Sequence, residues 1–326
     1  MLKYDLSILI PARQEEFLSE TLVDLLKNIR GKTEIIVVLD GAPELKPLPE
    51  DPRLTVIRHY ESVGQRKATN EACKLSNAKY VMKTDAHTAW DEGFDVKLMA
   101  NMQDDWTVVP VMRNLWVFDW VCPKDSFTHY QDKGEICPKC NGKMEKKMVW
   151  IAKEKPQSTA YRFDTDMHFQ YHRERKNSPE YKEQLKTGLT ETMNFQGSCF
   201  MLTREKYWEL NICDEEFGSW GAQSVEVACK TWLSGGKCMV NHKTWYAHLF
   251  RTKDAVGFGF PYKQDNKQVE HARQRSRELF LDNTWEKQIY PLSYLVDKFA
   301  PVPGWHDGTD NGMLEKIREH GKKMLK

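Results

Sequence analysis

The stretch TEIIVVLDGAP (residues 33–43) is an unbroken apolar run that ends in a polar turn. Similar runs lie at residues 6–12, 54–59 and 79–85. The intervening segments 15–29 and 63–77 are predicted to be helices, the first from the helical spacing of its apolar side chains. An apolar run without polar alternation predicts a strand buried on both faces, and strands that alternate with helices predict a parallel sheet. The front of the chain therefore predicts an α/β domain.

Two acids mark the ends of these predicted strands. Asp40 closes the run at 33–43, and Asp85 closes the run at 79–85. Ligands of open α/β sheets bind beyond the carboxyl ends of the strands, so we expect both acids to face one crevice. His87 lies two residues after Asp85, and in extended backbone the two side chains would point to the same side and could share one ligand. Neither G-x-G-x-x-G nor G-x-x-x-x-G-K-[ST] occurs, so nothing supports a dinucleotide fold or a P-loop.

Composition narrows the class of protein. With 40% hydrophobic residues the chain can build a sizeable core, and 29% charged residues exclude a membrane-buried protein. The formal net charge of +1 gives no strong field toward nucleic acid or membrane surfaces. No apolar stretch approaches the roughly 20 residues that span a bilayer, and the start MLKYDLSILIPARQEE is charged too soon for a signal peptide. We expect a cytoplasmic protein with no membrane partner.

A cysteine-bearing segment in the middle of the chain predicts a metal site. Cys137 and Cys140 form the one C-x-x-C of the sequence, and Cys122 lies upstream of them. Structural zinc takes four ligands, so a fourth is needed. His129 is the expected fourth ligand, and Asp125, at the end of the similar stretch C-P-K-D, is the alternative. A closed, non-catalytic zinc would fold a segment too short to build its own core.

Six segments carry a resemblance to a known family. They are LSILIPARQEE, VVLDG, TDAHT, MNFQGSCFMLTREKYWEL, FGSWGAQSVEVACKTWLSGG and YAHLFR, in that order. The chain resembles GT-A-fold glycosyltransferases: the family 2 enzymes at its front, and the polypeptide N-acetylgalactosaminyltransferases further on. That second family pairs a D-x-H motif with a later G-H-V-F-R and a W-G-G-E-N loop. The resemblance covers roughly residues 5–290 outside the cysteine-bearing segment.

This resemblance implies a fold and a division of the chain. The fold is a GT-A type, mostly parallel sheet flanked by helices, with a zinc-ribbon-like insert and a helical C-terminal tail. We expect four parts. They are a nucleotide-sugar-binding half (1–115), a cysteine-rich insert (116–160), an acceptor- and metal-binding half (161–264) and a helical extension (265–326).

The resemblance also implies a catalytic metal site. Asp85 and His87 match the D-x-H ligands, and His248 matches the later histidine. One carboxylate and two imidazoles suit Mn²⁺ better than Mg²⁺, which prefers oxygen ligands. Arg251 matches a position that contacts the diphosphate, where its fork of donors suits phosphate. His248 could instead be a buried histidine with its own partners, and Arg251 a surface ion pair.

A uridine-nucleotide site follows from the same comparison. Asp40 matches the acid that hydrogen-bonds uracil, although it could simply cap a turn. The residues matching the nucleotide-facing end of the first strand are Ala12, Arg13 and Glu15. Gly64 and Arg66 match the helix that closes over the base and ribose. The implied cofactors are a UDP-sugar donor and Mn²⁺ or Mg²⁺.

The chain departs from the family at the W-G-G-E-N loop. It has Trp220, Gly221, Ala222, Gln223 and Ser224 at these positions. The amide of Gln223 does not titrate near neutrality, so it cannot act as a general base. Glu226 is the nearby carboxylate, a turn of helix away, and the absence of a base in the loop favours a retaining reaction. Trp220 is expected in the sugar or acceptor wall, with a core position as the alternative.

The expected activity is transfer of a sugar from a UDP-sugar to an acceptor hydroxyl. The chain resembles soluble bacteriophage enzymes that glycosylate hydroxymethylated bases in DNA, so we expect a hydroxymethylated pyrimidine as acceptor. The basic residues expected to contact DNA are Arg162, Arg173, Arg175 and Lys176. Two alternatives stay open: a cytoplasmic transferase acting on a glycan, lipid carrier or protein, and a non-catalytic module that binds nucleotide sugar or nucleic acid.

Overall fold

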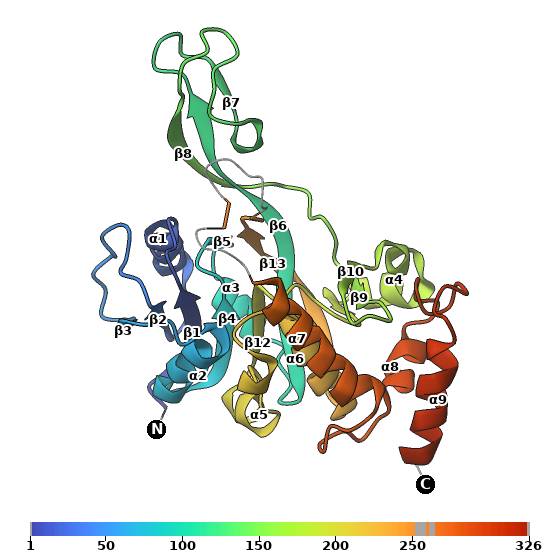
Figure 1. Ribbon diagram of the computed structural model, residues 1–326. Coiled ribbons are helices and arrows are strands. Elements are labelled where there is room, and N and C mark those ends of the chain that lie inside the picture. The colour runs from blue at the N-terminus through green and yellow to red at the C-terminus, as the bar shows by residue number, and fades with distance from the viewer. Residues whose placement is uncertain (1, 252–258, 261–264, 325–326) are drawn as a thin grey trace.

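The front half of the chain alternates strands and helices (Figure 1). The structure is a computed structural model that describes residues 2–251, 259–260 and 265–324. The first elements are β1 (Tyr4–Ala12), α1 (Leu18–Asn28), β2 (Thr33–Asp40), β3 (Leu54–His59), α2 (Gln65–Leu75) and β4 (Ala78–Thr84). β1 pairs in parallel with both β2 and β4, and β2 pairs in parallel with β3. The parallel sheet predicted for this half is confirmed.

The rest of the central sheet mixes strand directions. Its further strands are β5 (Thr88–Trp90), β6 (Trp106–Val121), β11 (Leu189–Glu191), β12 (Cys199–Thr203) and β13 (Lys237–His248). The order is β11-β13-β6-β12-β4-β1-β2-β3; β12 is antiparallel to both neighbours, and β6 and β13 are parallel to each other. The carboxyl ends of β1 to β4, β6 and β13 therefore lie at one edge of the sheet, which we call the carboxyl edge.

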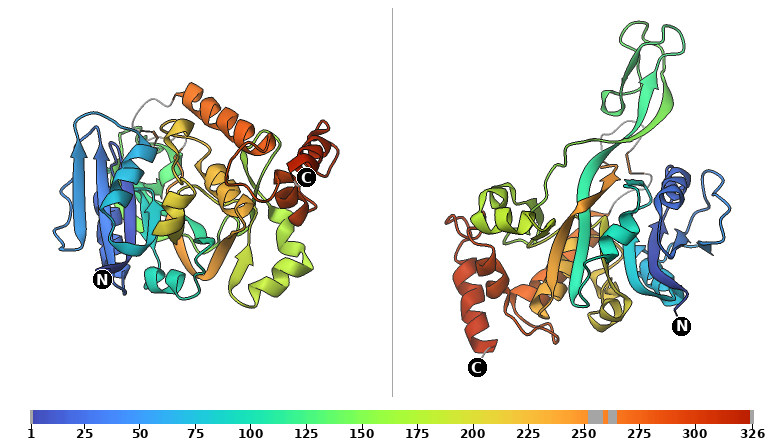
Figure 2. Two further views of the ribbon diagram at one scale, coloured as in Figure 1. Left: turned by 90° about the horizontal axis from the view of Figure 1, so that it is seen from below. Right: turned by 180° about the vertical axis from the view of Figure 1, so that it is seen from behind.

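Helices cover both faces of this sheet (Figures 1 and 2). Besides α1 and α2 they include α3 (Phe94–Met99), α4 (Pro179–Leu185), α5 (Arg204–Glu209) and α6 (Gln223–Leu233). Every residue of α6 is buried. A helix buried on all sides belongs to the core rather than the surface. The apolar residues of the inner strands, such as Ile8 and Val37, are fully buried in the same core.

The cysteine-rich insert forms an arm that projects from the carboxyl edge (Figure 1). β6 pairs with β13 up to Asn114, and beyond this its residues pair with β7 (Thr128–Tyr130) and β8 (Glu145–Ala152) in antiparallel fashion. A short 3₁₀ turn, η1 (Gln131–Lys133), follows β7. Phe118, Trp120 and Met144 of the arm belong to a second apolar cluster, which also includes Leu249 at the end of β13. β6 runs unbroken across residue 115, which is the predicted boundary between the first two parts. The four-part division stays a prediction.

The remaining elements follow β8 in the chain or lie between the later strands and helices. They are β9 (Tyr161–Phe163), β10 (Phe169–Tyr171), η2 (Arg173–Asn177), η3 (Glu215–Phe217), α7 (Asn266–Ser276), the π-helical turn η4 (Arg277–Leu281), α8 (Leu292–Lys298) and α9 (Met313–Met324). β9 and β10 form a separate antiparallel pair. From residue 265 onward the described chain has helices and no strand, as predicted for the tail. No helix of the described residues is long and apolar enough to span a membrane.

The central strand β1 generates a stability prediction. Ile8 is 0% exposed, so replacing it with alanine removes buried methylene groups and leaves a cavity. We expect Ile8→Ala to lower the free energy of unfolding by about 2–5 kcal/mol. Val23→Ala on α1 is the matched control, because Val23 is 53% exposed and its loss should change stability by less than about 0.5 kcal/mol. Chemical denaturation of both variants checks this, and equal effects would contradict the burial of β1.

Candidate active site

A cavity of about 660 Å³ opens at the carboxyl edge. The ends of β1, β4 and β13 meet there with the loop that precedes α6. Most of the predicted site residues line it: Ala12, Arg13, Glu15, Asp40, Gly64, Asp85, His87, Trp220, Gln223, His248 and Arg251. The volume lies within the roughly 300–1,000 Å³ that is typical of ligand sites. The structure therefore gathers these residues, which lie far apart in sequence, around one concave space.

Asp85, His87 and His248 form a group that could hold a metal ion. Each offers one ligand atom, and these atoms lie within 4.8 Å of one another. Nε2 of His248 is 3.2 Å from Oδ2 of Asp85, and Nε2 of His87 is 4.0 Å from the same oxygen. One carboxylate oxygen with two imidazole nitrogens is a donor set that fits Mn²⁺. The three side chains stand together because β5 pairs with the end of β13, opposing Thr88 to His248.

The electrostatics of this group favour the forms that bind metal. Burial acts to raise the pKa of Asp85, but the ammonium of Lys83 and the two histidines outweigh it and hold the pKa well below its usual range. Burial lowers the pKa of His248 to about 4, so its ring is neutral near pH 7. A carboxylate and a neutral imidazole are the protonation states that a divalent ion requires. Asp85 and His248 are therefore in the forms that bind metal.

Glu15 connects the metal group to Arg251. Its Oε2 lies 3.2 Å from Nδ1 of His87 and also contacts Nη2 of Arg251. Burial acts to raise the pKa of Glu15, but His87 and Arg251 outweigh it and keep the pKa below its ordinary value. A carboxylate on one ring nitrogen fixes the orientation of a histidine ligand. Glu15 thus positions His87, a role that the sequence did not indicate.

Asp40 caps the turn that leads into α2. Its carboxylate accepts hydrogen bonds from Ser62 Oγ (2.8 Å) and from the backbone N–H groups of Val63 (2.5 Å) and Gly64 (3.1 Å). The turn-capping alternative is therefore what the geometry shows, although Asp40 also lines the cavity. Gly64 has φ +92°, and a Cβ there would lie 2.6 Å from Cβ of Ser219. Glycine is required because the start of α2 packs directly against the loop before α6.

Two predicted site residues are placed elsewhere. Arg66 and Glu226 are buried, and neither lines the cavity. Arg66 donates from Nε to Glu226 Oε2 (3.0 Å) and from its two terminal nitrogens to the carbonyls of Gly218 (3.0 Å) and Gly221 (2.6 Å). Glu226 Oε1 also accepts from Lys230 Nζ at 3.0 Å. We correct both assignments: Arg66 holds the loop 218–221 instead of a nucleotide, and Glu226 neutralises two buried cations instead of acting as a base.

The loop before α6 forms one wall of the cavity. Trp220 is 39% exposed and lines the cavity, so it belongs to the wall and not to the core. Gln223 is buried, donates to Cys213 Sγ (3.0 Å) and accepts from Gln65 Nε2 (3.3 Å). These contacts fix its amide as a structural group. Loop 219–224 therefore presents no side chain that titrates near neutrality.

The sequence reasoning missed several residues that line the cavity. Lys83 contacts Asp85 and donates to the carbonyl of Gly197 (3.1 Å). Its position two residues before Asp85 in a strand was a signal, because side chains at i and i+2 share a face. His168, on the β9–β10 turn, lines the cavity and has its Nδ1 3.3 Å from Asp164 Oδ2. No local pattern indicated His168, because only tertiary folding brings that turn to the carboxyl edge.

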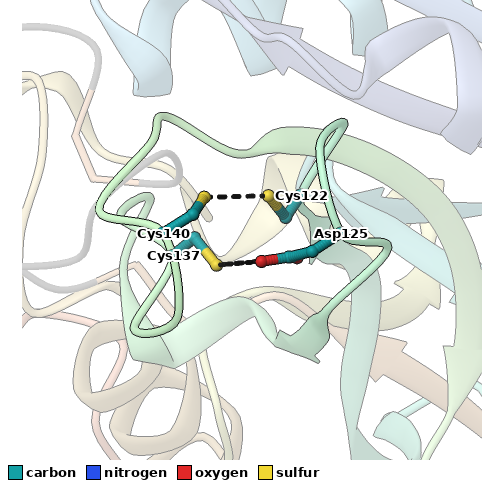
Figure 3. A group of neighbouring side chains, drawn as sticks. All are labelled: Cys122, Asp125, Cys137 and Cys140. Atoms are coloured by element: carbon teal, nitrogen blue, oxygen red, sulfur yellow. Dashed lines mark hydrogen bonds between the residues drawn. The ribbon is translucent and has the colours of Figure 1, made fainter.

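The arm brings together the predicted zinc ligands with one change. Cys122, Asp125, Cys137 and Cys140 offer ligand atoms within 4.8 Å of one another (Figure 3). His129, the expected fourth ligand, is outside this group, because its Nε2 lies 3.1 Å from Sδ of Met144. The alternative, Asp125, occupies the fourth position. We therefore correct the predicted ligand set from His129 to Asp125.

The basic residues expected to contact DNA do not form one exposed face. Arg175 is buried, pairs with Glu180 at 2.7 Å and stacks on Phe299. Arg173 is exposed and lies over the ring of Tyr171. Burial of Arg175 removes it from the expected phosphate contacts.

The mixed sheet, the acid–histidine group at its carboxyl edge and the cavity around it define a protein of the GT-A class. The matched part of the crystal structure of GalNAc-T7 with UDP, GalNAc and Mn²⁺ has the same fold: the TM-score is 0.61 at 15% identity, covering 98% of this chain and 55% of that chain.

Sequence comparison shows which proteins the chain is similar to. Residues 7–120 match the family model Glycosyl transferase family 2. The chain is 24% identical over 284 residues to putative polypeptide N-acetylgalactosaminyltransferase 13 of Drosophila melanogaster, covering 82% of this chain and 45% of the relative. It is 22% identical over 297 residues to human polypeptide N-acetylgalactosaminyltransferase 14, with 86% and 46% covered. The family 2 match thus covers residues 7–120 of the 326, and the chain spans less than half the length of these two relatives, to which it is similar.

The acid–histidine group predicts loss of metal on mutation. Asp85→Ala or His248→Ala removes one of three ligands, so we expect Mn²⁺ binding to fall sharply while the fold is kept. If the ion stabilises a leaving group, any transfer activity should fall on the order of a thousandfold or more. Mn²⁺ titration followed by electron paramagnetic resonance measures the first effect. Asp104→Ala, which changes a 77% exposed acid, is the control and should bind Mn²⁺ as the unaltered protein does.

The Arg66–Glu226–Lys230 group predicts a stability effect. Glu226→Gln keeps the shape of the side chain but removes the counter-charge of buried Arg66 and leaves Lys230 with Asp214 at 3.7 Å. We therefore expect a loss of about 3–5 kcal/mol in unfolding free energy. Glu209→Gln, on a side chain that is 48% exposed, is the control. A Glu226→Gln protein of normal stability and no transfer activity would instead restore the catalytic role.

Proposed function

We propose that the protein is a metal-dependent glycosyltransferase that moves a sugar from a UDP-sugar to an acceptor hydroxyl. The observation that carries this proposal is the single cavity in which Asp85, His87 and His248 meet Arg251. A nucleotide-sugar enzyme needs a cation and fixed donors beside its diphosphate, and this cavity has residues for both. The relatives named for sugar transfer and the GT-A neighbour with bound UDP, GalNAc and Mn²⁺ support it.

Each residue has a proposed role. Asp85, His87 and His248 would hold Mn²⁺, or Mg²⁺, which when bound supplies a Lewis acid against the diphosphate charge. Arg251 would bind the diphosphate: its terminal nitrogens contact Glu15 and the carbonyl of Gly259, while its buried Nε has no hydrogen-bond partner among the described residues. A buried donor without a partner is costly, and an anionic ligand would satisfy it. Asp40 would accept a hydrogen bond from the base, since a carboxylate has more lone pairs than its capping bonds use.

The stereochemical outcome depends on which group takes the proton of the acceptor hydroxyl. Loop 219–224 presents no base, and Glu226 is held in a buried ion pair. We propose that the departing phosphate oxygen takes the proton and that the anomeric configuration is retained. His168, paired with Asp164, is the group that would serve as base in an inverting reaction. The anomeric configuration of the product, read by nuclear magnetic resonance, decides between the two.

The acceptor is a separate part of the proposal. The acceptor suggested by the sequence is a hydroxymethylated pyrimidine in DNA, and the same resemblance suggests an origin in a bacteriophage. Burial of Arg175 weakens the surface expected to contact DNA. A serine or threonine hydroxyl in a polypeptide is the second candidate, and the names of the relatives favour it. A cytoplasmic location also stays a proposal. The predicted structural zinc is independent of these questions, because its ligands lie in the arm and none lines the cavity.

One experiment tests donor and acceptor together. The protein is incubated with Mn²⁺ and a panel of nucleotide sugars, with hydroxymethylated DNA, with a serine- and threonine-rich peptide, or with neither. We expect a UDP-sugar to be consumed and the mass of one acceptor to rise by one sugar residue, with Asp85→Ala inactive in every arm. Sugar on the nucleoside supports the DNA acceptor, and sugar on the peptide supports the polypeptide acceptor.

Two results would overturn the activity. One is full transfer in the presence of a chelator with no metal in the protein. The other is binding of nucleotide sugar with neither transfer nor hydrolysis under any condition, which would indicate a non-catalytic binding module.

A further inference from the structure

The arm contains two loops with nearly the same sequence. The first loop, residues 122–127, begins Cys-Pro-Lys-Asp, and the second loop, residues 137–142, begins Cys-Pro-Lys-Cys. In both loops the first cysteine is buried and the next three residues are exposed. Asp125 in the first loop therefore stands where Cys140 stands in the second.

The backbone of the two loops is also the same. In each, the N–H of the first cysteine donates to the carbonyl five residues on, at 2.8 and 2.9 Å. The N–H of the residue four positions on donates back to the carbonyl of that cysteine, at 3.0 and 2.9 Å. This residue is Ser126 in one loop and Asn141 in the other, with left-handed φ of 56° and 57°. Two loops that share every one of these bonds present their first and fourth side chains in the same way.

The fourth side chains are also held alike. Oδ1 of Asp125 accepts a hydrogen bond from the backbone N–H of Phe127 at 3.0 Å. In the second loop, Gly142 lies close to Cys140, since a Cβ at Gly142 would be 3.3 Å from Sγ of Cys140. In each case the residue two positions on lies against the side chain at the fourth position. A carboxylate and a thiolate therefore replace one another at equivalent places.

The four ligand atoms lie within 4.8 Å of one another, and two of the distances between them fit a tetrahedral ion. Sγ of Cys122 lies 3.5 Å from Sγ of Cys140, and Sγ of Cys137 lies 3.5 Å from Oδ2 of Asp125 (Figure 3). Zinc bonds of about 2.3 Å to sulfur and about 2.1 Å to oxygen, at tetrahedral angles, place ligand atoms about 3.5–3.8 Å apart. A disulfide would need its sulfur atoms at about 2.05 Å. The spacing matches ligands around one ion and not a cross-link.

We infer that the two loops form a zinc site whose four ligands are Cys122, Asp125, Cys137 and Cys140. Three thiolates select a soft or borderline metal, and a four-coordinate site built only from protein side chains is closed to substrate, so the ion is structural. His129 takes no part. It lies on β7, where it pairs in register with Trp120, and its Nε2 faces the thioether of Met144.

The ion holds the tip of the arm in shape. Apart from β6, the arm has β7 of 3 residues, the turn η1 and β8 of 8 residues, so its sheet is small. Cys122 and Cys137 belong to the apolar cluster of the arm, which continues through Phe118 to Leu249, the neighbour of His248. Metal binding in such a segment supplies folding free energy, so loss of the ion should unfold the tip first. The arm stands at the carboxyl edge, beside the cavity.

Metal content and affinity test the site without any assay of sugar transfer. Protein purified without added metal should contain about one zinc per chain by elemental analysis. Competition with a chromophoric chelator gives the affinity. Asp125→Ala should weaken zinc binding at least about tenfold, and Cys140→Ser should do the same. Asp125→Cys completes a second C-P-K-C loop and should bind zinc at least as tightly as the unaltered protein.

His129→Ala is the matched control and should leave zinc affinity unchanged. Limited proteolysis adds a second readout: zinc removal should expose residues 122–144 to cleavage while the remainder of the domain resists. Mn²⁺ binding at Asp85 confirms that each variant is folded. Absence of zinc from the purified protein together with no uptake by the reduced protein would overturn the site. The ligand set would be overturned if His129→Ala lost its zinc while Asp125→Ala bound zinc as the unaltered protein does.

Discussion

The pairing of β5 with the end of β13 is the constraint on which the site depends. β4 and β13 are not neighbours in the sheet, since β12 and β6 lie between them. Asp85 at the end of β4 and His248 at the end of β13 would otherwise stay apart. The three residues of β5 cross this gap: Thr88 opposes His248, and the backbone N–H of Leu249 donates to the carbonyl of His87 at 3.2 Å. Both motifs are thereby joined by backbone hydrogen bonds before any ion is bound.

The second feature on which the site depends is the arrangement of charged groups at the carboxyl edge. Asp85 and Glu15 are carboxylates whose neighbours keep the pKa low: Lys83 first for Asp85, and His87 followed by Arg251 for Glu15. Burial lowers the pKa of His248, so that this ring stays neutral and able to bind metal. The cavity thus combines a site for a divalent cation with a guanidinium for an anion. This pairing is the electrostatic requirement for holding a diphosphate.

A second buried ion group supports the wall of the cavity from behind. Arg66, on α2, binds the loop before α6 through two carbonyls and Glu226 through its carboxylate. Family resemblance had suggested that Arg66 faces the nucleotide and that Glu226 could act as a base. Tertiary packing uses both side chains instead to join α2, the loop and α6. A charged residue near a site in sequence can therefore serve the scaffold, because a buried charge requires a partner wherever it lies.

The sequence by itself determined the parallel strands of the front half, because unbroken apolar runs between helical segments are compatible with few other folds. It also determined the residue types at the ends of β1, β2, β4 and β13, which line the cavity in the structure. It indicated a cysteine metal site in the insert, but it left His129 and Asp125 as alternatives. Choosing between them needed the backbone of two loops that are separate in the chain and superimposable in conformation. His168, the orienting role of Glu15 and the scaffold role of Arg66 were decided only by tertiary structure, since each depends on contacts between segments that no local spacing relates.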